Sequence, residues 1–195
     1  GNALDTQLAN FEANGGTGGG FLANTGTLNI GGVGPITGVN ATSSDIVITT
    51  DGNLTVNEAI TTLTSGNVTL DSTGGAATVR QIVAAGSVDI DADGAVTVEN
   101  SGIVTTSAGT DGSVALTSDS GQVTVQGFGI QTGGTDGHVD IDAQTDILIA
   151  LNGISTTAAT ANSSVALTAA TGQVTIQGNG VRTAGTDGHV DVDAE

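Results

Sequence analysis

Apolar and polar residues alternate along most of the chain in short runs that glycine-rich stretches separate. Runs such as Val-x-Ile and Val-x-Leu place aliphatic side chains on one side of an extended strand and the intervening side chains on the other. Glycine recurs every few residues, and each glycine would cost about 1 kcal/mol inside a helix. The pattern therefore predicts short β-strands joined by tight corners. The first strands of successive units begin near Ile46, Val68, Val88, Val114, Val139, Val165 and Val190.

The chain also repeats itself with a long period of 51 residues. Residues 113–144 and 164–195 are identical at 22 of 32 positions. Inside this period lies a unit of 20 to 26 residues, with a second apolar run eight or nine residues after the first and a shorter third run before the next unit. Short strands and glycine-rich corners in a unit of this length are typical of one coil of a solenoid.

These units predict an all-β fold, a right-handed parallel β-helix. A single coil cannot bury its own apolar face, whereas a second coil stacked about 4.8 Å away pairs the two backbones and buries the aliphatic side chains in ladders. We expect the repeat domain to span residues 28–195, with an early, looser coil from Leu28 and Ile30. The repeat is cut at Glu195, which suggests a longer array or an end that stacks on another copy.

Residues 1–27 differ from the repeats and are expected to form a cap, a linker or an assembly segment. Leu4, Leu8 and Phe11 have the i, i+4, i+7 spacing of a short amphipathic helix, which Gly15 and Gly16 would end. The ends of a solenoid expose unpaired strand edges, so a cap is physically expected. A glycine-rich linker is the alternative.

Composition and charge exclude several classes of function. The 195 residues include 20 acids against two arginines, for a formal net charge of −18. Such acidity can indicate disorder, but 37% of the residues are hydrophobic and many of them lie in alternating runs. The charge disfavours binding to nucleic acid and to anionic lipid. No stretch approaches the ~20 apolar residues of a transmembrane segment, and without cysteine there is no disulfide framework.

Three of the expected strands carry pairs of aspartates that point outward. Neutral coils with Ala and Thr at the same positions lie between them, so the acid pairs would lie about 9.6 Å apart instead of 4.8 Å. This alternation explains why the long period contains two coils. Since Ca²⁺ binds six to eight oxygen atoms, the aspartates are candidate calcium ligands; a solvated acidic face that keeps the stack soluble is the alternative. The candidates are Asp89, Asp91, Asp140, Asp142, Asp191 and Asp193. No other cofactor is indicated.

Other candidate chemistry is sparse. His138 and His189 precede equivalent strands at a position where other coils carry serine, which indicates a corner residue. The segment GTDG at 109–112, 134–137 and 185–188 is typical of a turn. No arrangement of Ser, His and Asp resembles a nucleophile elbow, and the glycine-rich corners precede no helix, as a phosphate-binding loop must. We therefore expect a protein that is not an enzyme.

Two further functions stay open as alternatives. A threonine column resembles in part the ladders of ice-binding solenoids, although Leu148 interrupts it and strand propensity also explains threonine. A β-helical polysaccharide lyase or hydrolase needs a base beside clustered acids, but Arg80 and Arg182 lie on different coils, and no Trp or Tyr offers a stacking surface for sugars. The threonines are Thr55, Thr78, Thr97, Thr124 and Thr175.

The repeats, together with GNLTVNEAI at 52–60 and GNVTLDSTGGAATV at 66–79, resemble the repeat region of filamentous-haemagglutinin-like exoproteins. These are large secreted adhesins of Gram-negative bacteria, and the resemblance covers roughly residues 28–195. It implies a β-helix that projects from the bacterial cell surface and serves in adhesion, biofilm or filament building. The implied partners are further coils or copies of the same chain and a receptor on a cell surface or matrix.

Overall fold

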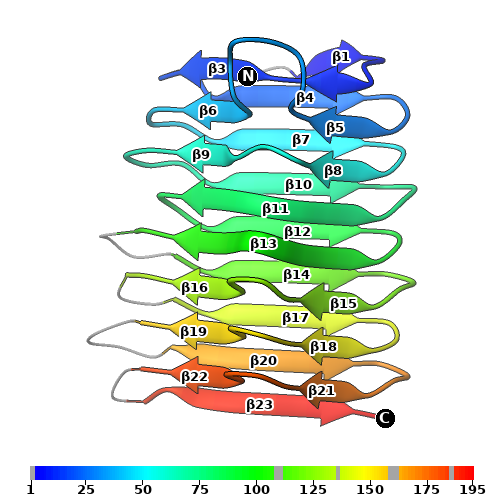
Figure 1. Cartoon of the computed structure of the whole chain (residues 1–195), viewed down its shortest axis with the longest axis vertical. Helices are drawn as coiled ribbons and strands as arrows, with labels where there is room; N and C mark the ends of the chain where they lie inside the picture. Colours follow the sequence, from blue (N-terminus) through cyan, green and yellow to red (C-terminus); the bar gives the residue numbers. More distant parts are fainter. Residues whose placement is uncertain (1–2, 108–111, 135–136, 158–162, 185–186) are drawn as a thin grey trace.

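The computed structural model describes residues 3–107, 112–134, 137–157, 163–184 and 187–195. Within these ranges the chain forms β-strands and no helix. The strands pair in parallel in a stack of coils. In Figure 1 the chain runs to the right along the rear sheet and to the left along the front sheet as it descends, which is a right-handed winding. The predicted parallel β-solenoid is confirmed.

One sheet, called sheet A here, contributes a single strand to each coil. Its strands lie in sequence order from one end of the stack to the other (Figure 1). They are β1 (Leu4–Thr6), β4 (Gly20–Asn24), β7 (Ile46–Thr50), β10 (Val68–Ser72), β12 (Val88–Ala92), β14 (Val114–Ser118), β17 (Val139–Ala143), β20 (Ser164–Ala169) and β23 (His189–Ala194).

The second sheet, sheet B, has two columns of strands, which β11 (Ala77–Ala84) and β13 (Val96–Thr105) span without a break. The first column otherwise contains β2 (Asn10–Phe11), β5 (Leu28–Ile30), β8 (Leu54–Val56), β15 (Val123–Val125), β18 (Ile147–Ile149) and β21 (Val174–Ile176). The second column otherwise contains β3 (Ala13–Gly16), β6 (Val39–Ala41), β9 (Ile60–Thr62), β16 (Ile130–Thr132), β19 (Ile154–Thr156) and β22 (Val181–Thr183).

The core consists of aliphatic side chains stacked in register between the two sheets. Val88 pairs with Val114, and Val114 with Val139, so that equivalent residues of successive coils lie one above another. All three valines are 1% exposed, as the sequence pattern predicts. Burying one such side chain stabilises the fold by about 1.5–3 kcal/mol, and the ladders extend along the stack.

Buried hydroxyl groups line the core where the strands end at the corners. Ser72 Oγ donates to the carbonyl of Gly52 at 2.7 Å, and Ser118 Oγ donates to that of Gly94 at the same distance. On the opposite corner Thr62 Oγ1 donates to the carbonyl of Gly66 at 2.9 Å. No buried side-chain nitrogen or oxygen in the described ranges lacks a partner. These hydroxyls bind corner carbonyls, of which that of Gly66 also accepts Gly86 N at 2.9 Å.

The amphipathic helix predicted from Leu4, Leu8 and Phe11 is wrong. The segment forms strands β1, β2 and β3, and β1 pairs with β4 so that Leu4 lies opposite Leu22. A short isolated helix is marginal in water, whereas pairing with the next coil satisfies the backbone groups of β1, β2 and β3 that face that coil. The cap, linker or assembly role of residues 1–27 stays a prediction.

The early coil begins before the predicted Leu28. Leu28 belongs to β5 in sheet B, and the sheet A strand of the same coil is β4, in which Leu22 is buried. The glycine-rich sequence before Leu22 hid this strand, because only one large aliphatic residue of β4 points inward.

No helix in the described residues is long and apolar enough to cross a membrane.

Candidate functional site

The outer face of sheet A carries most of the charged side chains that the sequence singles out. From β12 onward, the acid pairs alternate with neutral pairs as predicted: Asp89 lies opposite Ala115, and Ala115 lies opposite Asp140. The second outward column follows the same order, with Asp91, Thr117 and Asp142 in successive coils. The neutral coils thus separate the acid pairs along the stack.

The alternation fails at one place that the sequence analysis missed. Asp71 of β10 lies directly opposite Asp91 of β12, without a neutral coil between them. Neighbouring strands lie about 4.8 Å apart, so the two carboxylates face each other at the closest spacing the stack allows. The 20-residue offset from Val68 to Val88 contains this information, since it also carries Asp71 onto Asp91.

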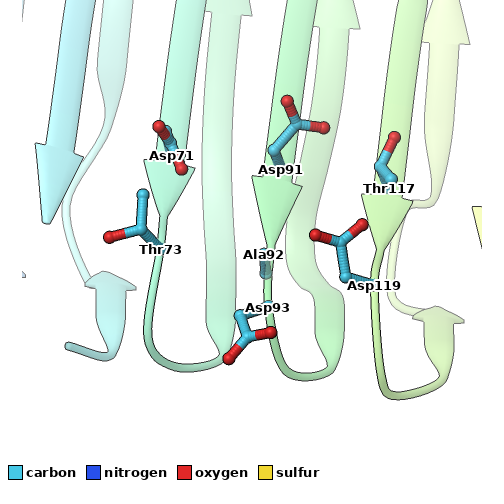
Figure 2. Close-up of a pocket in the computed structure, with 7 residues that line it drawn as sticks. All are labelled: Asp71, Thr73, Asp91, Ala92, Asp93, Thr117 and Asp119. Carbon is cyan, nitrogen blue, oxygen red and sulfur yellow. The ribbon is translucent and has the colours of Figure 1, made fainter. Parts of the chain in front are cut away.

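A hollow of about 310 Å³ opens beside this pair at the end of the sheet A strands. Figure 2 shows the carboxylates of Asp71 and Asp91 on adjacent strands and those of Asp93 and Asp119 where the chain leaves β12 and β14. Three successive coils therefore contribute acids to one concave surface. Its lining is Asp71, Thr73, Asp91, Ala92, Asp93, Thr117 and Asp119.

The pKa values of three aspartates on this face lie above their ordinary range. Burial raises the pKa of Asp71, and the carboxylates of Asp91 and Asp119 raise it further. Burial also raises the pKa of Asp89, with additional repulsion from Asp91 and Asp71. For Asp140 the causes are burial and the neighbouring Asp142.

The ion pair found in the described residues lies on the other sheet. Arg80 Nε donates to Glu99 Oε1 at 2.8 Å, between β11 and β13 of sheet B. Arg182 lies on β22, also in sheet B. The two arginines of the chain therefore both belong to sheet B, and the acidic face of sheet A stands without a neighbouring cation from its own strands.

The structure does not bring the six predicted calcium ligands together. Asp89 and Asp91 share β12, Asp140 and Asp142 share β17, and a neutral coil lies between these pairs. The third pair, Asp191 and Asp193, lies on β23 beyond another neutral coil. Among the described residues, no group of three or more His, Cys, Asp or Glu side chains is arranged to hold a metal ion. Calcium binding at these residues stays a prediction.

His138 occupies a corner column, as expected from the serines at equivalent positions. Its Nδ1 accepts the backbone N–H of Ser164 at 3.2 Å and lies 2.8 Å from Ser164 Oγ. Ser164 in turn lies opposite His189. The imidazole thus ties one coil to the next. Of the three GTDG segments, residues 109–111, 135–136 and 185–186 lie outside the described ranges.

The threonine column on the outside of sheet B is formed in register. Thr55, Thr78 and Thr97 lie opposite one another in successive coils. Thr124 continues the column, and Leu148 then separates it from Thr175. Leu148 therefore interrupts the threonine column in the structure, between Thr124 and Thr175.

The outer faces as a whole offer carboxylates, hydroxyls and amides in repeated columns. Such groups bind water and cations, and repetition spreads them along the stack. The function of the chain has to be inferred from these coils, because no protein-family model, no curated protein and no solved structure matches it.

Proposed function

We propose that this chain is a non-enzymatic structural and adhesive module of an extracellular bacterial surface protein. The observation that carries the proposal is the continuous aliphatic ladder from Leu22 in β4 to Leu167 in β20, with each coil in register with the next. A fold in which each coil contacts only its neighbours can be extended by adding coils, so it suits a protein that must bridge a distance.

The chemistry of the outer faces supports a structural role. The outward positions carry threonine, alanine, aspartate and asparagine in columns, and the same residue types recur from coil to coil. The acidic face of sheet A keeps a stack of β-strands soluble and repels other copies of the same face. A surface of this kind favours binding spread over several coils.

The sequence resemblance supports the extracellular and adhesive part of the proposal. Filamentous-haemagglutinin-like exoproteins combine a β-helical repeat with attachment to surfaces, and the likeness here extends over roughly residues 28–195. A receptor on a cell surface or matrix, and further coils of the same array, are the partners that this resemblance implies.

Attachment of coated particles tests the adhesive part. Beads coated with the chain are compared with beads coated with an unrelated acidic protein of similar net charge, on cultured epithelial cells and on immobilised matrix proteins. We expect several-fold more attached beads with the chain. Attachment equal to that of the acidic control would contradict an adhesive role.

One observation favours a second candidate, a β-helical polysaccharide-active enzyme. The hollow places Asp71 and Asp91 side by side, and the pKa of Asp71 is raised by burial and by its acidic neighbours. Glycoside hydrolysis uses two carboxyl groups, of which one has a raised pKa and donates a proton. Turnover of neutral or uronic-acid polysaccharides by the native chain, lost in Asp71→Asn, would establish this candidate and contradict the non-enzymatic proposal.

A further inference from the structure

One coil of sheet B departs from the side-chain columns of its neighbours. At two successive outward positions it carries Leu148 and Ala150, whereas the coils on both sides carry threonine and then glutamine. The residues of these neighbours are Thr124 and Gln126 in the preceding coil and Thr175 and Gln177 in the following coil. The strand β18 thus presents apolar groups between two rows of side chains that form hydrogen bonds.

The departure continues at the corner that follows β18. Leu151 has φ of 59° and is 60% exposed. The adjacent coils place glycine here, Gly127 with φ of 71° and Gly178 with φ of 69°. A bulky side chain at positive φ is an outlier, and one that stays exposed gains little from burial. Packing therefore does not account for leucine at this corner, and strain of this kind concentrates at ligand sites.

An exposed aromatic side chain lies at the same corner of the preceding coil. Phe128 is 61% exposed. The carbonyl of Gly127 accepts Asn152 Nδ2 at 3.0 Å, so the corner that carries Phe128 lies against the corner that carries Leu151. Phe128 and Leu151 are thus one position apart on adjacent coils. The four residues Phe128, Leu148, Ala150 and Leu151 are called the apolar strip below.

A hollow of about 240 Å³ opens beside the Leu148 end of the apolar strip. Polar groups surround the leucine there, and Asp146 Oδ1 accepts Gln173 N at 2.9 Å, which fixes the carboxylate at the rim. The hollow is smaller than the roughly 300–1,000 Å³ of a site for a drug-sized ligand, so it suits a single ring. Its lining is Gln122, Asp146, Ile147, Leu148, Gln173 and Thr175.

The apolar strip and the hollow form one elongated surface. In Figure 1 β15, β18 and β21 follow one another in the front sheet, so the strip runs across the stack along β18. Strand residues rise about 3.3 Å each, which places Leu148 and Leu151 roughly 10 Å apart. A ligand that reaches from the hollow to the corner therefore contains more than one ring.

The size and the charge of this surface indicate the chemistry of its ligand. The apolar strip exposes on the order of 300 Å², well below the roughly 800 Å² that each partner buries in a stable protein complex. The net charge of −18 and the carboxylate of Asp146 disfavour an anionic ligand. A neutral sugar chain fits both conditions, because its rings have apolar faces and its edges carry hydroxyl groups for the flanking threonines, glutamines and Asp146.

We propose that the apolar strip and the adjoining hollow bind a neutral oligosaccharide. Leu148 and Phe128 contact the apolar faces of sugar rings, and the polar rows on both sides of β18 bind their hydroxyl groups. This inference rests on the adhesive role proposed above, for which it names the chemistry of the receptor.

A variant that restores the columns tests the strip. In Leu148→Thr/Ala150→Gln/Leu151→Gly each new residue is the one that both adjacent coils carry at that position, so we expect this variant to unfold at no lower temperature than the parent. Phe128→Ala is a second variant and alters one exposed side chain. Leu63→Thr is the matched control, because Leu63 is 64% exposed at a different corner.

Electrophoresis in native gels that contain a soluble polysaccharide measures binding as retardation. The neutral probes are dextran, xyloglucan, galactomannan and galactan, and the anionic probe is polygalacturonate. We expect at least one neutral probe to retard the parent and the Leu63→Thr control equally, and polygalacturonate to retard neither. Binding should fall at least about tenfold in the triple variant and several-fold in Phe128→Ala.

Three results would overturn the inference: no retardation by any neutral probe, retardation by polygalacturonate alone, or equal retardation of the parent and the folded triple variant. Coated beads separate this failure from that of the adhesive role. Beads that carry the triple variant and attach as well as parent beads would keep the adhesive role and refute the sugar site. Loss of attachment to matrix proteins in the triple variant, without retardation by any neutral probe, would assign the strip to a protein partner instead.

Discussion

At the scale of single residues, the outer face of sheet A shows how the stack manages its negative charge. Most acid pairs have neutral neighbours in the adjacent coils, as Asp142 has in Thr117 and Thr168. Asp71 and Asp91 are the exception, and the pKa of Asp71 is raised accordingly. The six predicted aspartates could be placed from the V-D-I-D and V-D-V-D patterns, but Asp71 follows a threonine and a leucine and is found only through the coil offset.

Asp71→Asn should therefore stabilise the chain. Like charges directly opposite in a sheet cost about 0.2–1 kcal/mol, and the substitution removes one such contact. We expect an increase of about 0.5 kcal/mol in the free energy of unfolding at neutral pH, measured by denaturant titration. Asp142→Asn, whose neighbours in both adjacent coils are neutral, is the control. A gain as large in the control would show that general charge reduction explains the effect.

The raised pKa values also predict the direction of the pH dependence. A carboxyl whose pKa is higher in the folded chain than in the unfolded chain binds protons more readily when folded, so its contribution to stability increases as pH falls and is lost as pH rises through the folded pKa. For Asp71, Asp89 and Asp140 the free energy of unfolding should thus rise at low salt as the pH falls from neutral toward the ordinary pKa of aspartate. Asp71→Asn should flatten this rise, as should 1 M salt. A steady loss of stability over the same interval would contradict the prediction.

At the scale of elements, the strands after residue 45 could be predicted from period-two alternation, because their inward residues are almost all aliphatic. The corners could not. Ser72 and Thr62 are buried and bind corner carbonyls, yet a binary pattern counts them as polar and places them outside. The first coil was missed because Leu4, Leu8 and Phe11 also fit a helical period. The pairing of Leu4 with Leu22, which decides against the helix, is a contact between coils and does not show in the local pattern.

Two neighbouring residues of β7, Val47 and Ile48, point to opposite faces of the sheet, so their substitution tests which face is inward. Ile48 is 1% exposed in the core, whereas Val47 points outward and is half-buried. Ile48→Ala should lower the free energy of unfolding by about 2–5 kcal/mol, because it leaves a cavity in the ladder. Val47→Ala should lower it by less than about 1 kcal/mol. Similar losses at both sites, measured by denaturant titration, would contradict the assignment of faces.

At the scale of the whole molecule, the repeat accounts for both the fold and the proposed role. Residues 113–163 form one 51-residue period, which contains an acid coil and a neutral coil in sheet A. The stacking of these coils follows from the sequence, because no coil can bury its aliphatic residues alone. The hydrogen bonds from residues 31–38 to Glu12 and Glu58 do not follow from it, since they join residues about 20 positions apart through the coil geometry.

Changing the number of coils tests the stacking most directly. A chain in which residues 113–163 are duplicated in tandem is compared with the native chain by small-angle X-ray scattering. Two added coils should lengthen the particle by about 9.6 Å and leave the radius of its cross-section unchanged. A wider cross-section, or no increase in length in a folded variant, would contradict an in-register stack of coils.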